Sequence, residues 1–298
     1  PAFVRKLTRF RRAVAAATNR RFVRQVKRLA PDVVLCTHFL PVEVMGELER
    51  HGQKPVTVCV VTDFEAHALW LEQAVDLYCV AAEETRTSLI ARGVEAQRVL
   101  ATGIPVSPRF HLPVNAEGTR RSLGLRDDLP TLLVLSGGFG MGPLAEIVQA
   151  LDRVQQPVQV LAVTGRNTDL RATLATRDYR HPTRVLGFVT NMHELMSVAD
   201  LILTKPGGLT TSEALALGKP LFLWNPIPGQ EAANSDFLLE HGAAAKVNRV
   251  DDLPFRLNQL LGSKKLRDMA RAARHLGRPQ AAKEVCAAAA RLLNSSVP

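Results

Sequence analysis

The segment LILTKPGGLTTSEALAL, residues 201–217, indicates how the second half of the chain folds. An apolar stretch typical of a buried strand leads into Pro206, two glycines and then a helical pattern. Gly207 and Gly208 leave backbone N–H groups accessible at the expected start of the helix, where an anion binds readily. Lys205 adds a full positive charge at the same place. The segment therefore predicts a strand–loop–helix unit that binds a diphosphate.

Three polar side chains follow on the same predicted helix. Thr210 and Thr211 are expected to cap the helix and also to reach an oxygen atom of the ligand. Glu213 is expected in the first helical turn. There it either compensates the helix dipole or accepts hydrogen bonds from the two hydroxyls of a ribose.

Two more loops of the second half each join a predicted strand to a predicted helix. The stretch LSGGFGMGP, residues 135–143, is either a second anion-binding turn or only a tight turn. Its GGxGxG spacing argues against NAD, and so does the lack of an acidic residue after the next strand. In the loop 226–231, Gln230 and Glu231 are suited to bind sugar hydroxyls, or they simply begin a helix.

In the first half, Asp63, His67 and Trp70 follow an apolar strand predicted over residues 56–61. They are therefore expected at the carboxyl edge of a sheet, where α/β proteins bind ligands. If the segment is helical, Asp63 and His67 point the same way. Core packing is the alternative for each of them.

Strands and helices alternate along the chain at intervals of about 20 residues, which predicts parallel sheets with helical crossovers. A proline-rich stretch at residues 105–115 interrupts the pattern, which then begins again. We therefore expect an α/β protein of two Rossmann-like domains.

Positive charge is concentrated at the beginning of the chain. Residues 1–30 contain ten Lys and Arg and no acid, which leaves 28 basic and 28 acidic residues in the remainder. Their apolar residues recur at helical spacing, which indicates an amphipathic helix on an anionic membrane surface. A packed helix with a solvated basic face is the alternative. Nucleic acid is disfavoured, because no aromatic platform accompanies the charge.

The sequence gives little support for a membrane-spanning helix or for a metal site. No apolar run approaches the roughly 18 residues of a membrane-spanning helix. The four cysteines have no CxxC pair, and no DxD, HExxH or EF-hand motif is present, so no metal ion is expected. We expect a peripheral protein on the cytoplasmic side of a membrane.

Six motifs together make the chain similar to a known family. They are Thr62-Asp-Phe with His67 and Trp70, Thr102-Gly-Ile-Pro-Val, Gly165-Arg-Asn, Leu186-Gly-Phe-Val, Leu203-Thr-Lys-Pro-Gly-Gly-Leu-Thr and Asn225-Pro-Ile-Pro-Gly-Gln-Glu. Over about residues 10–275 the chain resembles processive diacylglycerol glucosyltransferases and monogalactosyldiacylglycerol synthases. These are inverting enzymes with the GT-B fold, in which two Rossmann-like domains face each other across a cleft.

The resemblance implies two domains with distinct tasks. Residues 1–106 would be the remainder of the N-terminal, acceptor- and membrane-side domain. Residues 107–298 would form the C-terminal UDP-sugar-binding domain with its C-terminal helices. The family's opening strand and Gly-x-Gly-His loop have no match here. The resemblance therefore implies that the chain is N-terminally truncated and that the general-base histidine lies upstream of residue 1.

The resemblance also implies a role for each motif. Phe188 and Val189 would line the uracil pocket, and Glu213 would bind the ribose. Gln230 and Glu231 would bind the hexose, and Asp63 and His67 would serve the acceptor side with Trp70. The diphosphate would be held without a metal ion by Gly137, Gly138, Gly140, Lys205, Gly207, Gly208, Thr210 and Thr211.

The expected reaction moves glucose or galactose from a UDP-sugar to diacylglycerol or a glycolipid. A close alternative is a UDP-GlcNAc transferase that acts on a polyprenyl-linked peptidoglycan intermediate. A catalytically silent protein that binds UDP-sugar or membrane is the non-enzyme alternative, and a UDP-sugar epimerase on the same fold is less favoured.

Overall fold

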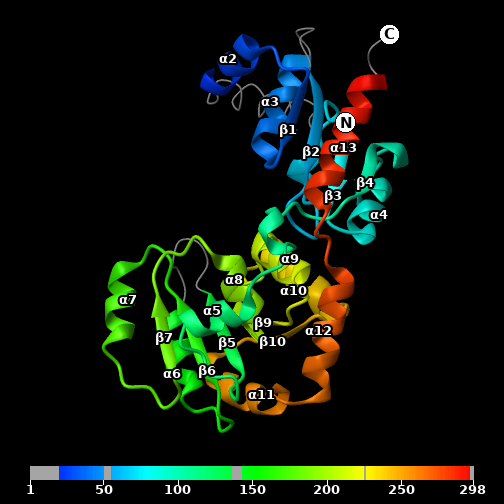
Figure 1. The fold of residues 1–298 in the computed structure, drawn as a ribbon. Helices are drawn as coiled ribbons and strands as arrows, with labels where there is room; N and C mark the ends of the chain where they lie inside the picture. Colours follow the sequence, from blue (N-terminus) through cyan, green and yellow to red (C-terminus); the bar gives the residue numbers. More distant parts are fainter. Residues whose placement is uncertain (1–19, 50–54, 136–142, 225, 296–298) are drawn as a thin grey trace. The chain divides into compact units, whose positions relative to one another are not determined.

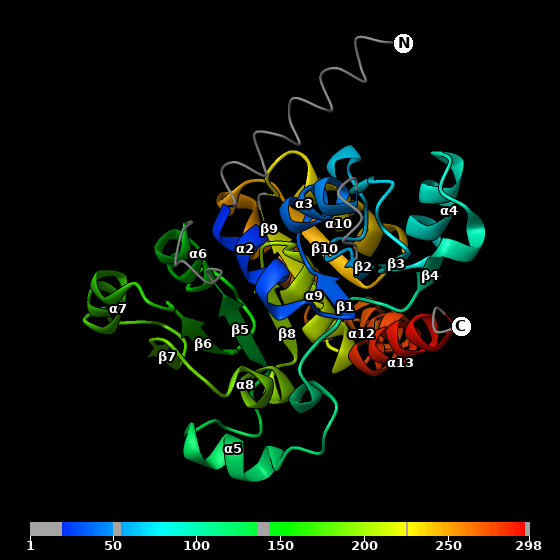
Figure 2. The ribbon, with the colours of Figure 1, turned by 90° about the horizontal axis from the view of Figure 1, so that it is seen from above.

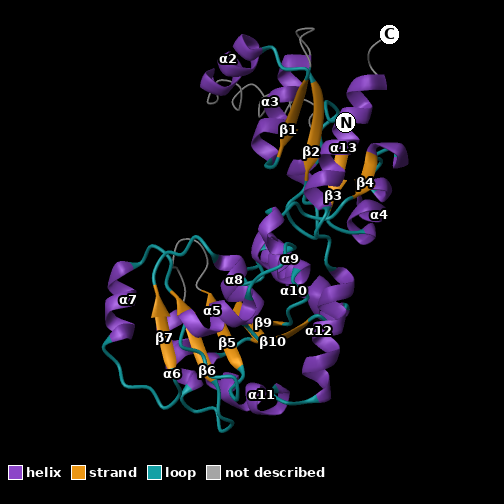
Figure 3. Ribbon diagram, viewed as in Figure 1, coloured by secondary structure: helices purple, strands orange, loops and turns teal. Residues whose placement is uncertain are grey.

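A computed structural model describes residues 20–49, 55–135, 143–224 and 226–295 of the chain (Figure 1). The chain forms two compact units. The first comprises residues 1–105 together with 280–298, and the second comprises residues 106–279. Each has a parallel sheet with helices, which confirms the predicted α/β class and its two Rossmann-like domains (Figure 3).

The first unit contains a parallel sheet in the order β1-β2-β3-β4. Its strands are β1 (Val33–Cys36), β2 (Val56–Val60), β3 (Leu77–Val80) and β4 (Val99–Ala101). Its helices are α2 (Arg20–Leu29), α3 (Phe39–Glu49), α4 (Glu83–Ala91) and α13 (Ala281–Ser295), with 3-10 turns at Ala68–Trp70 and Ala96–Arg98. Successive strand residues point to opposite faces, so each face has its own apolar cluster.

The last helix lies in a different unit from the expected one, because the expected division placed residues 107–298 in the C-terminal domain. Val285, Ala288 and Ala289 lie at helical spacing on α13 and are buried against Val58, Val60, Leu77 and Cys79 of β2 and β3. This apolar face of the first sheet needs a cover, and α13 supplies it. The structure therefore places residues 280–298 in the first unit.

The second unit contains six parallel strands in the order β10-β9-β8-β5-β6-β7. They are β5 (Thr131–Leu135), β6 (Gln159–Val163), β7 (Thr183–Leu186), β8 (Leu201–Thr204), β9 (Leu221–Trp224) and β10 (Ala244–Val247). The helices are α5 (Ala116–Ser122), α6 (Leu144–Leu151), α7 (Thr168–Ala175), α8 (Met192–Val198), α9 (Gly208–Ala216), α10 (Gln230–Glu240), α11 (Leu253–Leu260) and α12 (Lys264–Leu276), with 3-10 turns at Pro108–Phe110 and Val250–Asp252. Figure 2 shows α6 and α8 on opposite faces of this sheet.

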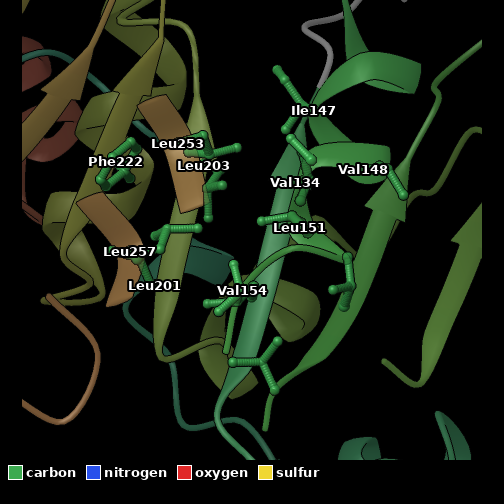
Figure 4. Close-up of a cluster of buried hydrophobic side chains, with 14 of the residues drawn as sticks. Val134, Ile147, Val148, Leu151, Val154, Leu201, Leu203, Phe222, Leu253 and Leu257 are labelled. Atoms are coloured by element: carbon green, nitrogen blue, oxygen red, sulfur yellow. The ribbon is translucent and has the colours of Figure 1, made fainter. Parts of the chain in front are cut away.

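One face of the second sheet is covered by α6 and α11. Leu201, Leu203 and Phe222 from the sheet pack there with Leu151 and Leu257 from the two helices (Figure 4). All five side chains are fully or almost fully buried. This core fixes the strands whose carboxyl ends carry the predicted ligand-binding loops.

The strand order determines where a ligand is expected to bind. Numbered along the unit, the strands follow the doubly wound order 3-2-1-4-5-6, whose direction reverses between β5 and β8. Loops that leave neighbouring strands at such a reversal run to opposite faces and leave a crevice at the carboxyl edge. The loops after β5 and β8 are the two glycine-rich segments singled out in the sequence.

We predict that Gly277→Ala destabilises the second unit. A Cβ atom at this position would collide with the carbonyl oxygen of Leu215 and would lie 3.0 Å from its carbonyl carbon, and backbone atoms cannot move aside cheaply. Overpacking of this kind costs about 1–3 kcal/mol. Urea unfolding would measure the loss. Gly187→Ala is the control, because its Cβ would make only ordinary contacts with Arg171; equal stability of the two variants would contradict the prediction.

Candidate functional site

The loop between β8 and α9 presents an open helix N-terminus. Gly207 is the N-cap residue of α9, and no side chain of the described residues caps this end. The N–H groups of Gly208, Leu209 and Thr210 have no hydrogen-bond partner within the described part of the chain. A Cβ atom at Gly207 would meet no atom of the described residues within 4 Å. Three free N–H groups at a helix start are suited to bind an anion.

The prediction that Thr210 and Thr211 cap this helix is wrong, because α9 begins at Gly208, two residues before Thr210. Thr211 instead lies buried in the helix, and its hydroxyl is 2.9 Å from the carbonyl oxygen of Gly207 and 3.1 Å from that of Gly208. Thr211 therefore stabilises the glycine turn. Contact of either threonine with a ligand stays a prediction.

Glu213 lies in the second turn of α9, since the first turn contains no acidic residue. This position rules out compensation of the helix dipole within the first turn, where that effect operates. The side chain is half-buried, and burial raises the pKa of its carboxyl group to about 7. Such a desolvated carboxylate gains from hydrogen-bond donors, so the predicted contact with ribose hydroxyls is chemically suitable.

Lys205 is held beside an aromatic ring at the same edge of the sheet. Its Nζ atom lies 5.3 Å from the ring centroid of Trp224, the last residue of β9. Trp224 is itself buried, so it provides a rigid surface for the ammonium group. Trp224 was not recognised from the sequence, where an aromatic residue at a strand end looks like ordinary core.

A second residue that was not recognised from the sequence, Asn234 of α10, holds the loop between β8 and α9 in place. Asn234 of α10 is fully buried, and its Nδ2 atom donates a hydrogen bond of 3.0 Å to the carbonyl oxygen of Pro206. This bond ties α10 to the turn that precedes α9. No sequence pattern marks Asn234, because the contact joins residues far apart in the chain.

The loop before α10 differs from the loop before α9 in its backbone conformation and in its hydrogen bonds. Gly229 is its N-cap with φ of 102°, a conformation that favours glycine. The Oε2 atom of Glu231 accepts a hydrogen bond of 2.9 Å from the N–H of Ile227, which stabilises the loop. The Gln230 side chain is exposed. Glu231 therefore has a structural role in this loop, and the sugar contacts of both residues stay predictions.

Residues after β6 and β7 form an exposed stacking pair. Phe188 is 62% exposed, and the guanidinium carbon of Arg166 lies 5.3 Å from its ring centroid. Val189 beside it is half-buried. A flat aromatic face is suited to a nucleobase, in line with the predicted uracil contact. Gly137, Gly138 and Gly140 lie outside the described residues.

In the first unit, aromatic rings cluster at the carboxyl ends of β1 and β2. The ring centroids of Phe39 and His67 are 5.1 Å apart, and those of His67 and Trp70 are 5.8 Å apart. His38 stacks on Phe39 at 4.2 Å and was not recognised from the sequence. Trp70 is almost fully buried, so it serves this core. A histidine two residues after the end of β1 was the signal that could have revealed His38.

The histidine geometry differs from the helical arrangement considered for Asp63 and His67. The chain between them is not helical, and His67 instead caps a 3-10 turn, its Nδ1 atom accepting a 3.2 Å hydrogen bond from the N–H of Leu69. Burial lowers the pKa of His67, although the charge of Asp63 opposes this effect. With Nδ1 as acceptor, the neutral ring carries its proton on Nε2 and presents a donor.

Comparison with solved structures identifies the class of fold. MurG of Acinetobacter baumannii has a TM-score of 0.66 at 23% identity and covers 90% of this chain and 76% of its own. MnaA of S. aureus, solved with UDP, has a TM-score of 0.65 at 15% identity, with 92% and 79% covered. The fold is therefore the GT-B fold, as predicted.

Comparison with family models and curated relatives then identifies the family. The model for the glycosyltransferase family 28 C-terminal domain matches residues 131–286, and that for monogalactosyldiacylglycerol (MGDG) synthase matches residues 5–106. Processive diacylglycerol beta-glucosyltransferases of Bacillus pumilus and Bacillus subtilis are each 34% identical over 247 residues, 82% of this chain. The chain spans 64% of the length of these relatives. It belongs to glycosyltransferase family 28, and the resemblance seen in the motifs is confirmed.

We predict that Glu213→Gln stabilises the protein at pH 8 but not at pH 4.5. The raised folded-state pKa means that the stability associated with Glu213 is present below the unfolded pKa of about 4.5 and is lost as the pH rises through about 7. Each unit of difference in pKa corresponds to about 1.4 kcal/mol, so the gain in the free energy of unfolding is at most about 3.5 kcal/mol, and solvent screening makes it smaller.

Urea unfolding at both pH values measures this gain. Glu240→Gln removes an exposed carboxylate of α10 and should show no such pH dependence. An equal effect of Glu213→Gln at pH 4.5 and pH 8 would contradict the assignment of a desolvated carboxyl group.

A third prediction concerns Asn234, whose hydrogen bond to Pro206 holds the loop before α9. Asn234→Asp keeps the shape of the side chain but removes the donor to Pro206 and buries a carboxylate, so we expect a loss of about 1–3 kcal/mol in stability. We also expect affinity for UDP to fall about tenfold, because the loop loses its position. Asp236→Asn, at an exposed site of the same helix, is the control. Unchanged UDP affinity in a folded Asn234→Asp variant would refute the positioning role.

Proposed function

We propose that this chain is part of an inverting glycosyltransferase that moves a hexose from a UDP-sugar to diacylglycerol or a glycolipid. The observation that carries the proposal is the open N-terminus of α9 beside Lys205, at the point where the strand order of the second unit reverses. The names of the curated relatives support the lipid acceptor and favour glucose as the donor sugar. A solved neighbour in complex with UDP-glucose, HepE of Anabaena, supports the nucleotide.

In the proposed reaction, an acceptor hydroxyl attacks the anomeric carbon of the sugar and UDP leaves from the opposite side. The bond between the anomeric carbon and the β-phosphate oxygen breaks, and negative charge develops on that oxygen. The N–H groups of Gly208 and Leu209 and the ammonium of Lys205 are positioned to stabilise this charge without a metal ion. Gly137, Gly138 and Gly140 are proposed to assist from the loop after β5.

The remaining donor contacts follow the carboxyl edge of the sheet. Phe188 and Val189 are proposed to hold the uracil, with Arg166 against the aromatic ring. Glu213 binds the ribose, and Gln230 with Glu231 binds the hexose. These roles rest on the motif positions together with the location of each loop at the same edge.

On the acceptor side, the attacking hydroxyl must transfer its proton to a base. His67 is a poor candidate in its described conformation, because its Nδ1 is occupied by a backbone N–H and its Nε2 carries the proton. We propose that His67 and Asp63 orient the acceptor.

We also propose that the first unit binds the cytoplasmic face of an anionic membrane through its basic N-terminal segment. The described helix α2 carries Lys27 and Arg28 in its last turn, and Val26 packs it onto the unit. Leu29 beside it is 68% exposed, an arrangement suited to a lipid surface. Within the described ranges, no helix is long and apolar enough to cross a bilayer.

The test supplies the full-length protein with radiolabelled UDP-glucose or UDP-galactose and with diacylglycerol in anionic vesicles. We expect label in the lipid fraction, greater with UDP-glucose. Lys205→Gln should lower the rate by about one to two orders of magnitude through lost stabilisation of the leaving group. Lys283→Gln, an exposed site on α13, should not.

Two other results of this assay would favour the alternative functions. Bound UDP without transferred label would indicate a silent binding protein. Label transferred only to a polyprenyl-linked peptidoglycan intermediate, and only from UDP-GlcNAc, would contradict the lipid acceptor proposed here.

A further inference from the structure

His38 is the exposed member of the aromatic cluster at the carboxyl ends of β1 and β2. It lies two residues after the last residue of β1 and directly before the first residue of α3. Its ring stacks on Phe39 with 4.2 Å between the centroids and lies 6.3 Å from the ring of Trp70. The ring of His67 is 5.8 Å from the same tryptophan. The two histidines therefore surround one buried ring.

A backbone hydrogen bond fixes the ring of His38. Its Nδ1 atom accepts a hydrogen bond of 3.2 Å from the N–H of Leu40, the same arrangement as between His67 and Leu69. A neutral imidazole that accepts at Nδ1 carries its proton on Nε2. Within the described ranges, the Nε2 atom of His38 forms no hydrogen bond. His38 therefore presents a hydrogen-bond donor, and in this state it is unsuited to act as a general base.

The cluster is rich in donors and short of acceptors. The Nε2 atom of His67 is a donor for the same reason as that of His38. The indole N–H of Trp70 is buried and has no hydrogen-bond partner in the part of the chain that the structure describes, which is uncommon for a buried donor. Burial lowers the pKa of His67, the charge of Asp63 opposes this effect, and His38 lowers the pKa further. Neutral donors of this kind are complemented by a neutral acceptor atom.

The surface beside the His38 donor is apolar. Leu40, whose N–H holds the ring of His38, is 45% exposed. Phe39 between them is half-buried. A fatty-acid ester presents a carbonyl oxygen, which only accepts hydrogen bonds, next to a hydrocarbon chain. One such group can accept from His38 and cover the apolar surface of Leu40 at the same time.

We propose that His38 recognises the acceptor by donating a hydrogen bond from Nε2 to an ester carbonyl oxygen of diacylglycerol, whose acyl chain contacts Leu40. The inference rests on the proposed transfer to diacylglycerol and names the part of that lipid which is bound. The attacking hydroxyl is a poorer partner for this donor, because its lone pair has to attack the anomeric carbon. His38 therefore determines specificity for acylated glycerol over acceptors without ester groups.

The test compares two acceptors that differ only in their carbonyl groups, dioleoylglycerol and its diether analogue, dioleyl glycerol ether. The full-length protein transfers label from UDP-glucose to each lipid in micelles of a detergent without ester or sugar groups, so that the acceptor supplies the only carbonyl oxygens. We expect kcat/KM to be about fivefold higher for the diester, the effect of one neutral hydrogen bond.

Two substitutions separate the donor of His38 from its place in the fold. His38→Asn keeps an acceptor for the N–H of Leu40 but removes the Nε2 donor, so the preference for the diester should fall below about twofold. His38→Gln carries an amide N–H at nearly the reach of Nε2 and should restore most of the preference. A purely structural role would lower both rates together and leave their ratio unchanged, which would overturn the inference.

His275→Asn is the matched control, because it makes the same change at an exposed histidine in the last turn of α12. It should leave the ratio unchanged, and an equal loss of preference in this variant would overturn the site. Equal rates with diester and diether in the wild-type protein would also overturn the inference, while the proposed transferase activity would stand. Transfer to neither lipid would count against that activity itself, and the role of His38 would fall with it.

Discussion

The negative charge of a nucleotide diphosphate has to be matched by protein groups wherever the ligand displaces water, and we propose that the second unit is arranged around this constraint. Its strand order brings the carboxyl ends of β5 and β8 together at the reversal point. There α9 begins at Gly208, and among the described residues no side chain caps it, which leaves its first N–H groups available. A side-chain cap at Gly207 would stabilise the helix itself but would compete with the anion.

The loop keeps this geometry because neighbouring elements fix it. Thr211 bonds to the carbonyl groups at the start of its own helix, and Asn234 bonds from α10 to Pro206. Trp224 supports the ammonium of Lys205 from β9. Three elements therefore position one turn, so in the proposed reaction little rearrangement would be needed when charge develops on the leaving phosphate. Preorganisation of this kind is the main way in which fixed dipoles stabilise a transition state.

The sequence predicted the features that depend on residues close together in the chain, such as the glycine-rich turn after β8. It did not predict the contacts between segments far apart in the chain. Glycines and Lys205 after an apolar run predicted a strand–loop–helix unit at this place, and the structure has that unit; anion binding by its loop stays a prediction. The start of α9 was misplaced by two residues, which put Glu213 in the wrong turn. The contacts of Asn234 and Trp224 join segments separated by whole elements. The apolar pattern of α13 fits any apolar face, so the sequence could not show which sheet it covers.

The central claim is that the turn before α9 recognises the diphosphate. Titration calorimetry that compares UDP with UMP on the same folded protein tests it most directly, since the two ligands differ by the β-phosphate alone. UDP should bind at least about tenfold more tightly, the value of one or two charge-assisted hydrogen bonds, and Lys205→Gln should remove most of that difference. Equal affinities for UDP and UMP would contradict the account.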